Sequence, residues 1–340
     1  MPAHLFHFSP RPLVANMISI DLPIFPFLIW FFYLFIYSIK KNDIDLENTI
    51  LISKVNNCLF NIDNFRLSVI PKSYNDCLKC SFTPNNGNSI PNSSDKDAIL
   101  TFAINKLFNL FPFIQTLRTT RTKCRLILCT NSQTISKYPK HIFLAAKCGL
   151  EIIDFSSKKI QKFINKNNIV VFRFFVFLFL LETNINLLER IIIVDLFDTI
   201  FQHDPFISDF LDVIYICDEG FPMTNGPNLK WVMNAFNSWK PEYDPSIKLN
   251  QDLKKNISKY NILNAGLIAG PIKLMIEFLK IMVYCGNNQT FQLIMNDQGF
   301  LNALIYSNAL KGKINYTILK PGNDFLTSIS CYADFVLNKN

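Results

Sequence analysis

The stretch Arg190–Phe206, RIIIVDLFDTIFQHDPF, decides how the rest of the sequence is interpreted. The run from Ile191 to Val194 is too short and too β-branched to be anything but a buried strand. Asp195 and Asp198 follow this strand directly. Because ligands of an open α/β sheet bind beyond the carboxyl ends of its strands, these two carboxylates are expected to meet a ligand.

The spacing of the two acids suits a hard divalent cation. Mg²⁺ and Mn²⁺ prefer oxygen ligands and usually keep waters or substrate oxygens in their coordination shell. The alternative is that Asp195, Asp198 or both simply cap the following turn. Beyond them the chain stays apolar as far as Phe201, and Pro205 then ends the element.

The same stretch, taken with Asn264-Ala265-Gly266 and Asp297-Gln298, resembles the GT-A-fold glycosyltransferases, which transfer a sugar from a nucleotide donor. In that branch a hydrophobic strand is followed by D-x-x-D, F-Q-x-D-P-F, N-A-G and D-Q, and the similarity covers roughly residues 96 to 320. The resemblance implies an α/β domain with a Rossmann-like mixed sheet flanked by helices. It also implies a Mn²⁺ or Mg²⁺ ion at Asp195 and Asp198 that binds the donor diphosphate.

The resemblance assigns further contacts with the donor. Asn105, after the first expected strand, is a candidate contact for the base or ribose, or alternatively a helix N-cap. The small residues of ILNAGLIAG, Ile262 to Gly270, allow close approach of a ligand, so Asn264 and Gly266 are expected near the donor sugar, with close strand packing as the alternative. Asp297 suits N-capping or a sugar hydroxyl, and the resemblance favours the sugar for Asp297 and Gln298.

Arg173 lies within the very apolar run Val170–Leu181. This run is too short to span a bilayer and is expected to be a buried helix on the sheet. An arginine in such an element needs a carboxylate or phosphate partner, and Arg173 would neutralise the diphosphate leaving group. A surface arginine that extends its charge to water is the competing interpretation.

Strands and helices alternate through the expected catalytic domain, which indicates a parallel sheet with right-handed crossovers. Asp218-Glu219-Gly220, after a strand at 213–217, is interpreted as a solvated turn in preference to an acceptor contact. Residues 221–239 are interpreted as an acceptor-side loop from their aromatic and amide content. The expected strands are 98–104, 125–129, 151–155, 213–217 and 262–270, and the expected helices are 107–117, 138–148, 170–181, 271–284 and one beginning near 296.

The amino-terminal part predicts a membrane anchor. Residues 22–39 carry no charge and are just long enough for a spanning helix, between a tail at 1–21 and a loop-rich stem at 40–95. The domain at 96–340 follows. The resemblance implies a single-pass protein of the Golgi or endoplasmic reticulum membrane with a luminal catalytic domain. Lys40, Lys41 and Lys54 favour the opposite orientation by the positive-inside tendency.

Composition agrees with a globular core plus a membrane segment, since 49% of the 340 residues are hydrophobic. The net charge of +8 suits an anionic ligand or bilayer, and the sequence holds no nucleic-acid-binding motif. Cys77 and Cys80 form a lone C-x-x-C, which favours a disulfide or free thiols over zinc. Four N-x-S/T acceptors suit a secretory-pathway domain: Asn92, Asn256, Asn288 and Asn315.

The sequence therefore predicts a membrane-anchored glycosyltransferase that uses a nucleotide-sugar donor, with a UDP-sugar preferred, and a glycan or glycoprotein acceptor. None of the four histidines lies after His203, where related metal-dependent enzymes supply a third ligand, and Cys331 or Asp334 would have to substitute. One alternative is consequently a decayed, non-enzymatic domain. Another is a haloacid-dehalogenase-type phosphohydrolase with Asp195 as nucleophile and Thr199 as a phosphate contact, although Ser328 stands where its last acid is expected.

Overall fold

The computed structural model describes residues 65–78, 91–156, 169–207, 210, 212–224, 227–239, 246–284, 296–322 and 326. All of them lie in one compact unit, Asn56–Asn340. The expected anchor at 22–39 falls outside the described residues. None of the described helices is both long and apolar enough to cross a membrane.

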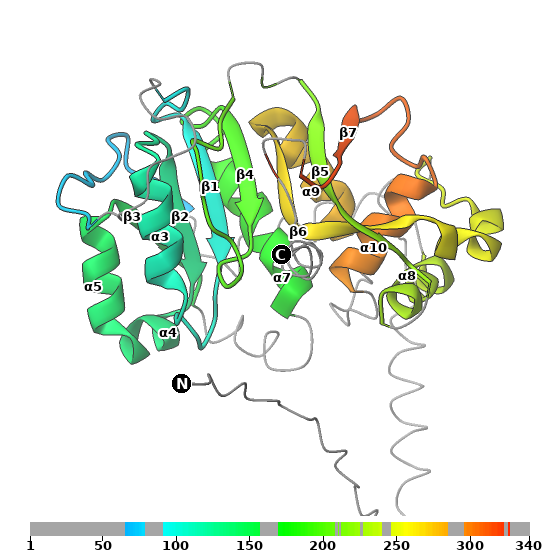
Figure 1. Ribbon diagram of the computed structural model, residues 1–340, viewed down its shortest axis with the longest axis horizontal. Coiled ribbons are helices and arrows are strands. Elements are labelled where there is room, and N and C mark those ends of the chain that lie inside the picture. Colours follow the sequence, from blue (N-terminus) through cyan, green and yellow to red (C-terminus); the bar gives the residue numbers. More distant parts are fainter. Residues whose placement is uncertain are drawn as a thin grey trace, which may run out of the picture. The chain divides into compact units, whose positions relative to one another are not determined.

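The core is a seven-stranded mixed sheet flanked by helices, consistent with a Rossmann-like fold (Figure 1). The strand order is β3-β2-β1-β4-β6-β5-β7. β1 to β4 run parallel to one another, whereas β6 is antiparallel to both β4 and β5. The strands are β1 Asp97–Phe102, β2 Arg125–Thr130, β3 Leu150–Asp154, β4 Arg190–Val194, β5 Ile214–Pro222, β6 Asn261–Pro271 and β7 Tyr316–Leu319.

The helices fill the connections between these strands. The two expected β-α-β connections of the first half are present, with boundaries shifted by a few residues. α7 confirms the expected buried helix around Arg173. The helices are α3 Leu110–Thr119, α4 Ser132–Lys137, α5 Pro139–Lys147, α7 Ile169–Thr183, α8 Pro227–Ser238, α9 Ile272–Tyr284 and α10 Asp297–Tyr306, with short 3₁₀ turns η2 Gln251–Lys255 and η3 Ile257–Lys259.

Alternate residues of the central strands point to opposite faces, as the pleat requires. Ile191 and Ile193 of β4 pack in the core cluster that contains α7, α9 and α10. Ile192 and Val194 pack in the second cluster, with α3 and α5. Asp195 continues this alternation, so its side chain falls on the α7 side of the sheet. The central strands are covered on both faces, which explains why β4 reads as a continuous apolar run.

Three sequence-based expectations need correction. Residues 65–78 were expected in a stem, but Phe65 is fully buried in the core of the domain. Cys77 is bonded to Cys148, 71 residues away, and not to Cys80. The expected acceptor-side loop at 221–239 contains the helix α8 over most of its length, because its apolar residues Val232, Ala235 and Phe236 recur at helical spacing and are buried.

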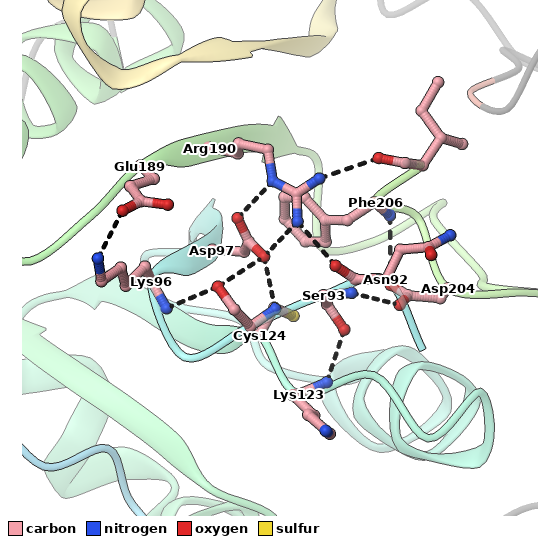
Figure 2. Close-up of polar contacts among 12 residues, drawn as sticks. Asn92, Ser93, Lys96, Asp97, Lys123, Cys124, Glu189, Arg190, Asp204 and Phe206 are labelled. Carbon is pink, nitrogen blue, oxygen red and sulfur yellow. Dashed lines mark hydrogen bonds and ion pairs between the residues drawn. The ribbon is translucent and has the colours of Figure 1, made fainter. Parts of the chain in front are cut away.

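The second half of the central motif is structural. Asp204 accepts a hydrogen bond from the amide of Ser93, which precedes β1, at 2.9 Å (Figure 2). It also accepts one from the hydroxyl of Thr122, which precedes β2, at 3.1 Å. Arg190, at the start of β4, binds both carboxylate oxygens of the fully buried Asp97 at 2.6 Å each. The segment after Asp198 therefore returns from the carboxyl edge of the sheet to its amino edge.

Aromatic packing holds this returning segment against the α3 side of the sheet. Phe201 meets Phe113 of α3 edge to face, with ring centroids 5.2 Å apart. Phe206 is fully buried and lies beneath the Arg190 guanidinium, 5.3 Å from its carbon. The F-Q-x-D-P-F string is thus accounted for by packing and hydrogen bonds.

Candidate functional site

Asp195 lies immediately beyond β4, where the antiparallel pairing of β4 with β6 continues. Its amide donates to the Gly266 carbonyl at 3.0 Å. The carboxylate rests directly over Gly266, because a Cβ built on that glycine would fall 2.0 Å from Asp195 Oδ2. A glycine is therefore required there for the carboxylate to keep its position. The side chain of Asp195 is 41% exposed, so it can still meet a ligand.

Arg173 joins three elements at this edge. Its Nη1 donates to Asp195 Oδ1, and its Nη2 donates to Asp297 Oδ2 at 2.7 Å and to the Ala265 carbonyl at 3.2 Å. Burial disfavours the guanidinium charge, but the carboxylates of Asp195 and Asp297 outweigh that effect, and the pKa of Arg173 is raised. The expected carboxylate partner exists, and the alternative of a surface arginine is wrong, since Arg173 is only 8% exposed.

Two further acids lie in this region: Asp198 interacts with Asp195, and Glu219 interacts with Asp198. Burial and the charge of Asp195 raise the pKa of Asp198. The pKa of Glu219 is raised to about 7, mainly because burial disfavours its charged form. A hydrogen bond with Asn264 opposes this shift, and the charges of Asp218 and Asp198 add to it. Raised pKa values of this kind indicate negative charge that the surrounding protein compensates only in part.

A short hydrogen bond joins Asn264 to Gly266 within β6. Asn264 Oδ1 accepts from the Gly266 amide at 2.6 Å, while the Asn264 side chain also bonds Glu219. The register of β5 against β6 shifts next to this point. β6 therefore brings Glu219 of β5 and Asp195 of β4 to the same edge.

Asp297 occupies the first position of α10, and Asn296 is the N-cap, accepting from the amides of Gln298 and Gly299. The N-cap alternative for Asp297 is therefore wrong, and its buried carboxylate serves Arg173. Gln298 uses its amide to bind Asn228 Oδ1 of α8 at 2.9 Å. In the next turn, Asn302 bonds both the amide and the carbonyl of Leu263, which fixes α10 against β6.

Asn105 sits apart from these residues, on the loop beyond β1. It is exposed, has a positive φ of 66°, and lies five residues before α3, so the N-cap alternative is wrong here also. Its amide donates to Thr134 Oγ1 at 2.8 Å, and its carbonyl accepts from Tyr138 at 3.0 Å. These contacts hold the loop in a tight turn. A role for Asn105 in binding a base or ribose stays a prediction.

The structure thus gathers most of the expected residues into one polar cluster at the carboxyl edge of the sheet, which we define as Arg173, Asp195, Asp198, Glu219, Asn264 and Asp297. Glu219 is the member that sequence reasoning missed. The signal was present, as an acid at the end of an expected strand, but it was interpreted as a solvated turn. β5 instead continues through Glu219 as far as Pro222.

The residues of the cluster fit part of a divalent cation site. Asp195 keeps an oxygen clear of Arg173, and the raised pKa of Asp198 shows a carboxylate that a nearby cation would favour in its charged form. Within the described part of the chain, no set of three His, Cys, Asp or Glu side chains is arranged to hold a metal. Such a cation would consequently need ligand oxygens and waters to complete its shell, as Mg²⁺ at phosphate sites usually does.

No protein-family model matches the chain, and no curated protein is significantly similar to it.

Proposed function

We propose that this protein is a glycosyltransferase of GT-A type that transfers a sugar from a nucleotide-diphosphate donor, preferably a UDP-sugar, to a glycan or glycoprotein acceptor. One observation carries the proposal: a buried arginine ties Asp195 beyond β4 to Asp297 at the start of α10, at the edge where α/β sheets bind ligands. Arg173 contacts one residue of each expected motif, D-x-x-D, N-A-G and D-Q, although these motifs lie far apart in the sequence.

The polar cluster suits group transfer with an anionic leaving group. The diphosphate gains negative charge as its bond to the anomeric carbon breaks, while an acceptor hydroxyl attacks that carbon. Arg173, fixed by Asp195 and Asp297, would hold a positive charge next to the leaving group without having to reorganise. Gly266 would keep the Asp195 carboxylate in position beside the donor, because any larger residue there would displace it.

In this proposal Asp195 and Asp198 would hold a Mn²⁺ or Mg²⁺ ion together with donor phosphate oxygens. When bound, that ion supplies Lewis-acid stabilisation of the departing diphosphate. Asp198 would be the residue most dependent on the ion, because its charged form is disfavoured by burial and by Asp195. Asn264 and Gln298 would position donor hydroxyls through their side-chain amides.

The proposed location is a Golgi or endoplasmic reticulum membrane with the domain in the lumen. The Cys77–Cys148 disulfide supports an oxidising compartment. The three acceptor asparagines within the described residues, Asn92, Asn256 and Asn315, are exposed. Asn288 lies outside the described residues.

The function is tested by incubating the full chain in mild detergent with a panel of UDP- and GDP-sugars and Mn²⁺, and measuring release of the nucleotide diphosphate. We expect one donor to be cleaved slowly by water and faster with a glycan acceptor, and Asp198→Ala to lose both activities. Lys280→Met, a change at a partly exposed residue elsewhere, is the control. Release of inorganic phosphate from phosphate esters, with no cleavage of any donor, would support the phosphohydrolase alternative instead.

A further inference from the structure

The net positive charge of this protein is accounted for by one part of the chain. The residues from Ala98 to Leu150 contain no Asp or Glu and eight Lys or Arg, a charge equal to the net +8 of the whole sequence. Such asymmetry points to an anionic partner. The eight cationic residues are Lys106, Arg118, Arg121, Lys123, Arg125, Lys137, Lys140 and Lys147.

Two of these residues serve the fold. Arg118 is 1% exposed and donates to the carbonyls of Cys148 and Cys124, and Arg125 is buried beside Glu151. Lys106, Lys137 and Lys140 are exposed instead. They lie where the loop after β1 meets the junction of α4 and α5.

Exposed apolar side chains lie among these lysines. Phe108 is 61% exposed and Phe143 is 62% exposed, with Leu144 beside it in α5 also exposed. We define the aromatic–lysine surface as Lys106, Phe108, Lys137, Lys140, Phe143 and Leu144. Large exposed apolar side chains that gather on a surface usually mark a site of interaction.

Direct contacts tie the two segments that carry this surface to each other. Lys137 Nζ and the Tyr138 hydroxyl both donate to the Asn105 carbonyl, at 3.2 and 3.0 Å, which ties the start of α5 to the loop after β1. His141 of α5 stacks near Phe111 of α3, with ring centroids 5.3 Å apart. Figure 1 shows α4 at the end of the sheet toward which β1 and β4 point.

The same contacts connect the surface to the polar cluster. Phe108 stacks on Phe197, with centroids 4.9 Å apart, and Phe197 stands between Asp195 and Asp198 in the sequence. Asn109 Nδ2 also donates to the Phe197 carbonyl. Whatever covers the aromatic–lysine surface would therefore lie next to the candidate active site.

We propose that the aromatic–lysine surface rests on a lipid bilayer that carries negative charge, with Phe108, Phe143 and Leu144 in the headgroup region and the lysines against lipid phosphates and carboxylates. Phenylalanine and leucine framed by lysine are typical of interfacial binding. These apolar side chains offer no hydrogen bonds to a polar partner, so they favour lipid over a glycan or nucleic acid. An anionic leaflet on either side of a membrane presents the same chemistry.

The expected anchor at Leu22–Ile39 adds a second argument for this occupant. A tethered domain meets the bilayer at a high effective concentration, so even a weak surface contact becomes populated. The aromatic–lysine surface would then rest on the membrane, and the acidic candidate site beside it would act on groups held near the bilayer surface. The inference does not depend on which reaction that site performs.

Hydrogen exchange of the full chain in lipid nanodiscs tests the proposal. We expect residues 105–111 and 137–147 to exchange more slowly in discs that contain phosphatidylserine than in discs of phosphatidylcholine alone. The double variant Lys137→Glu, Lys140→Glu should lower the lipid-binding constant at least about 30-fold, because loss of each lysine removes about 1 kcal/mol of attraction and each glutamate adds repulsion. Phe143→Ser should weaken the protection as well.

The control variant is Arg121→Glu, Lys123→Glu, which makes the same charge change at the amino edge of the sheet and should keep the protection. Equal exchange in the two kinds of disc would overturn the proposal. Loss of protection in both double variants would also overturn it, because net charge and not this surface would then be responsible. Protection by soluble heparin but not by phosphatidylserine would identify a polyanion site instead of a lipid surface.

Discussion

Replacing Arg173 with methionine should destabilise the domain more than any exposed charge change. Methionine keeps much of the aliphatic volume but leaves Asp297, whose side chain is 6% exposed, without its charged partner. Removing one partner of a buried ion pair typically costs about 3 to 5 kcal/mol, because the remaining charge stays buried and uncompensated. We expect Arg173→Met to lower the free energy of unfolding by that amount.

The measurement is chemical denaturation of the full chain in mild detergent, followed by far-ultraviolet circular dichroism. The double variant Arg173→Met, Asp297→Asn should recover a large part of the loss, because the amide removes the buried charge. Lys280→Met is the matched control: its ion pairs with Glu182 and Glu277 are partly exposed, so it should cost less than about 1 kcal/mol. A loss below about 1 kcal/mol for Arg173→Met would refute the view that this arginine joins the two carboxylates in the folded protein.

Three further predictions concern the site and its support. The pKa of Glu219 is raised to about 7, so its contribution to the free energy of unfolding is present below its usual pKa and is lost as the pH rises toward 7. The stability of Glu219→Gln relative to wild type, measured by denaturation, should therefore be about 1 to 2 kcal/mol higher at pH 8 than at pH 5. Equal stability differences at the two pH values would contradict this. Gly266→Ala would place a methyl group 2.0 Å from Asp195 Oδ2, and should weaken metal-dependent nucleotide binding at least about tenfold; unchanged binding would show that Asp195 is not needed in this position. Asp204→Ala should cost about 2 kcal/mol in a melting experiment, since it leaves the Ser93 and Phe206 amides without their side-chain acceptor, and should leave nucleotide binding unchanged in the folded fraction.

The central strand and its acids could be predicted from sequence because the signal is local. Four aliphatic residues followed by acids define a buried strand with a polar end, whatever the strand pairs with. The same reasoning found α7, where apolar residues leave no solvent-facing side. Arg173 in that helix was recognised as needing a partner because burial of an unpaired charge is costly.

Features that depend on distant pairing could not be predicted. The position of β6 between β4 and β5, antiparallel to both, is fixed by pairs of residues that lie 39 to 81 positions apart in the chain. The role of Asp204 depends on loops that precede β1 and β2, and no local pattern encodes them. The Cys77–Cys148 bond likewise joins partners that only the fold brings together.

The measurement that tests the central claim most directly is a calorimetric titration of UDP and GDP into the full chain, with and without Mn²⁺, alongside Asp198→Ala. We expect one nucleotide to bind only when Mn²⁺ is present, and Asp198→Ala to abolish that binding while remaining folded. Failure of both nucleotides to bind a folded protein, or equal binding by wild type and Asp198→Ala, would contradict a nucleotide-sugar site at this edge of the sheet.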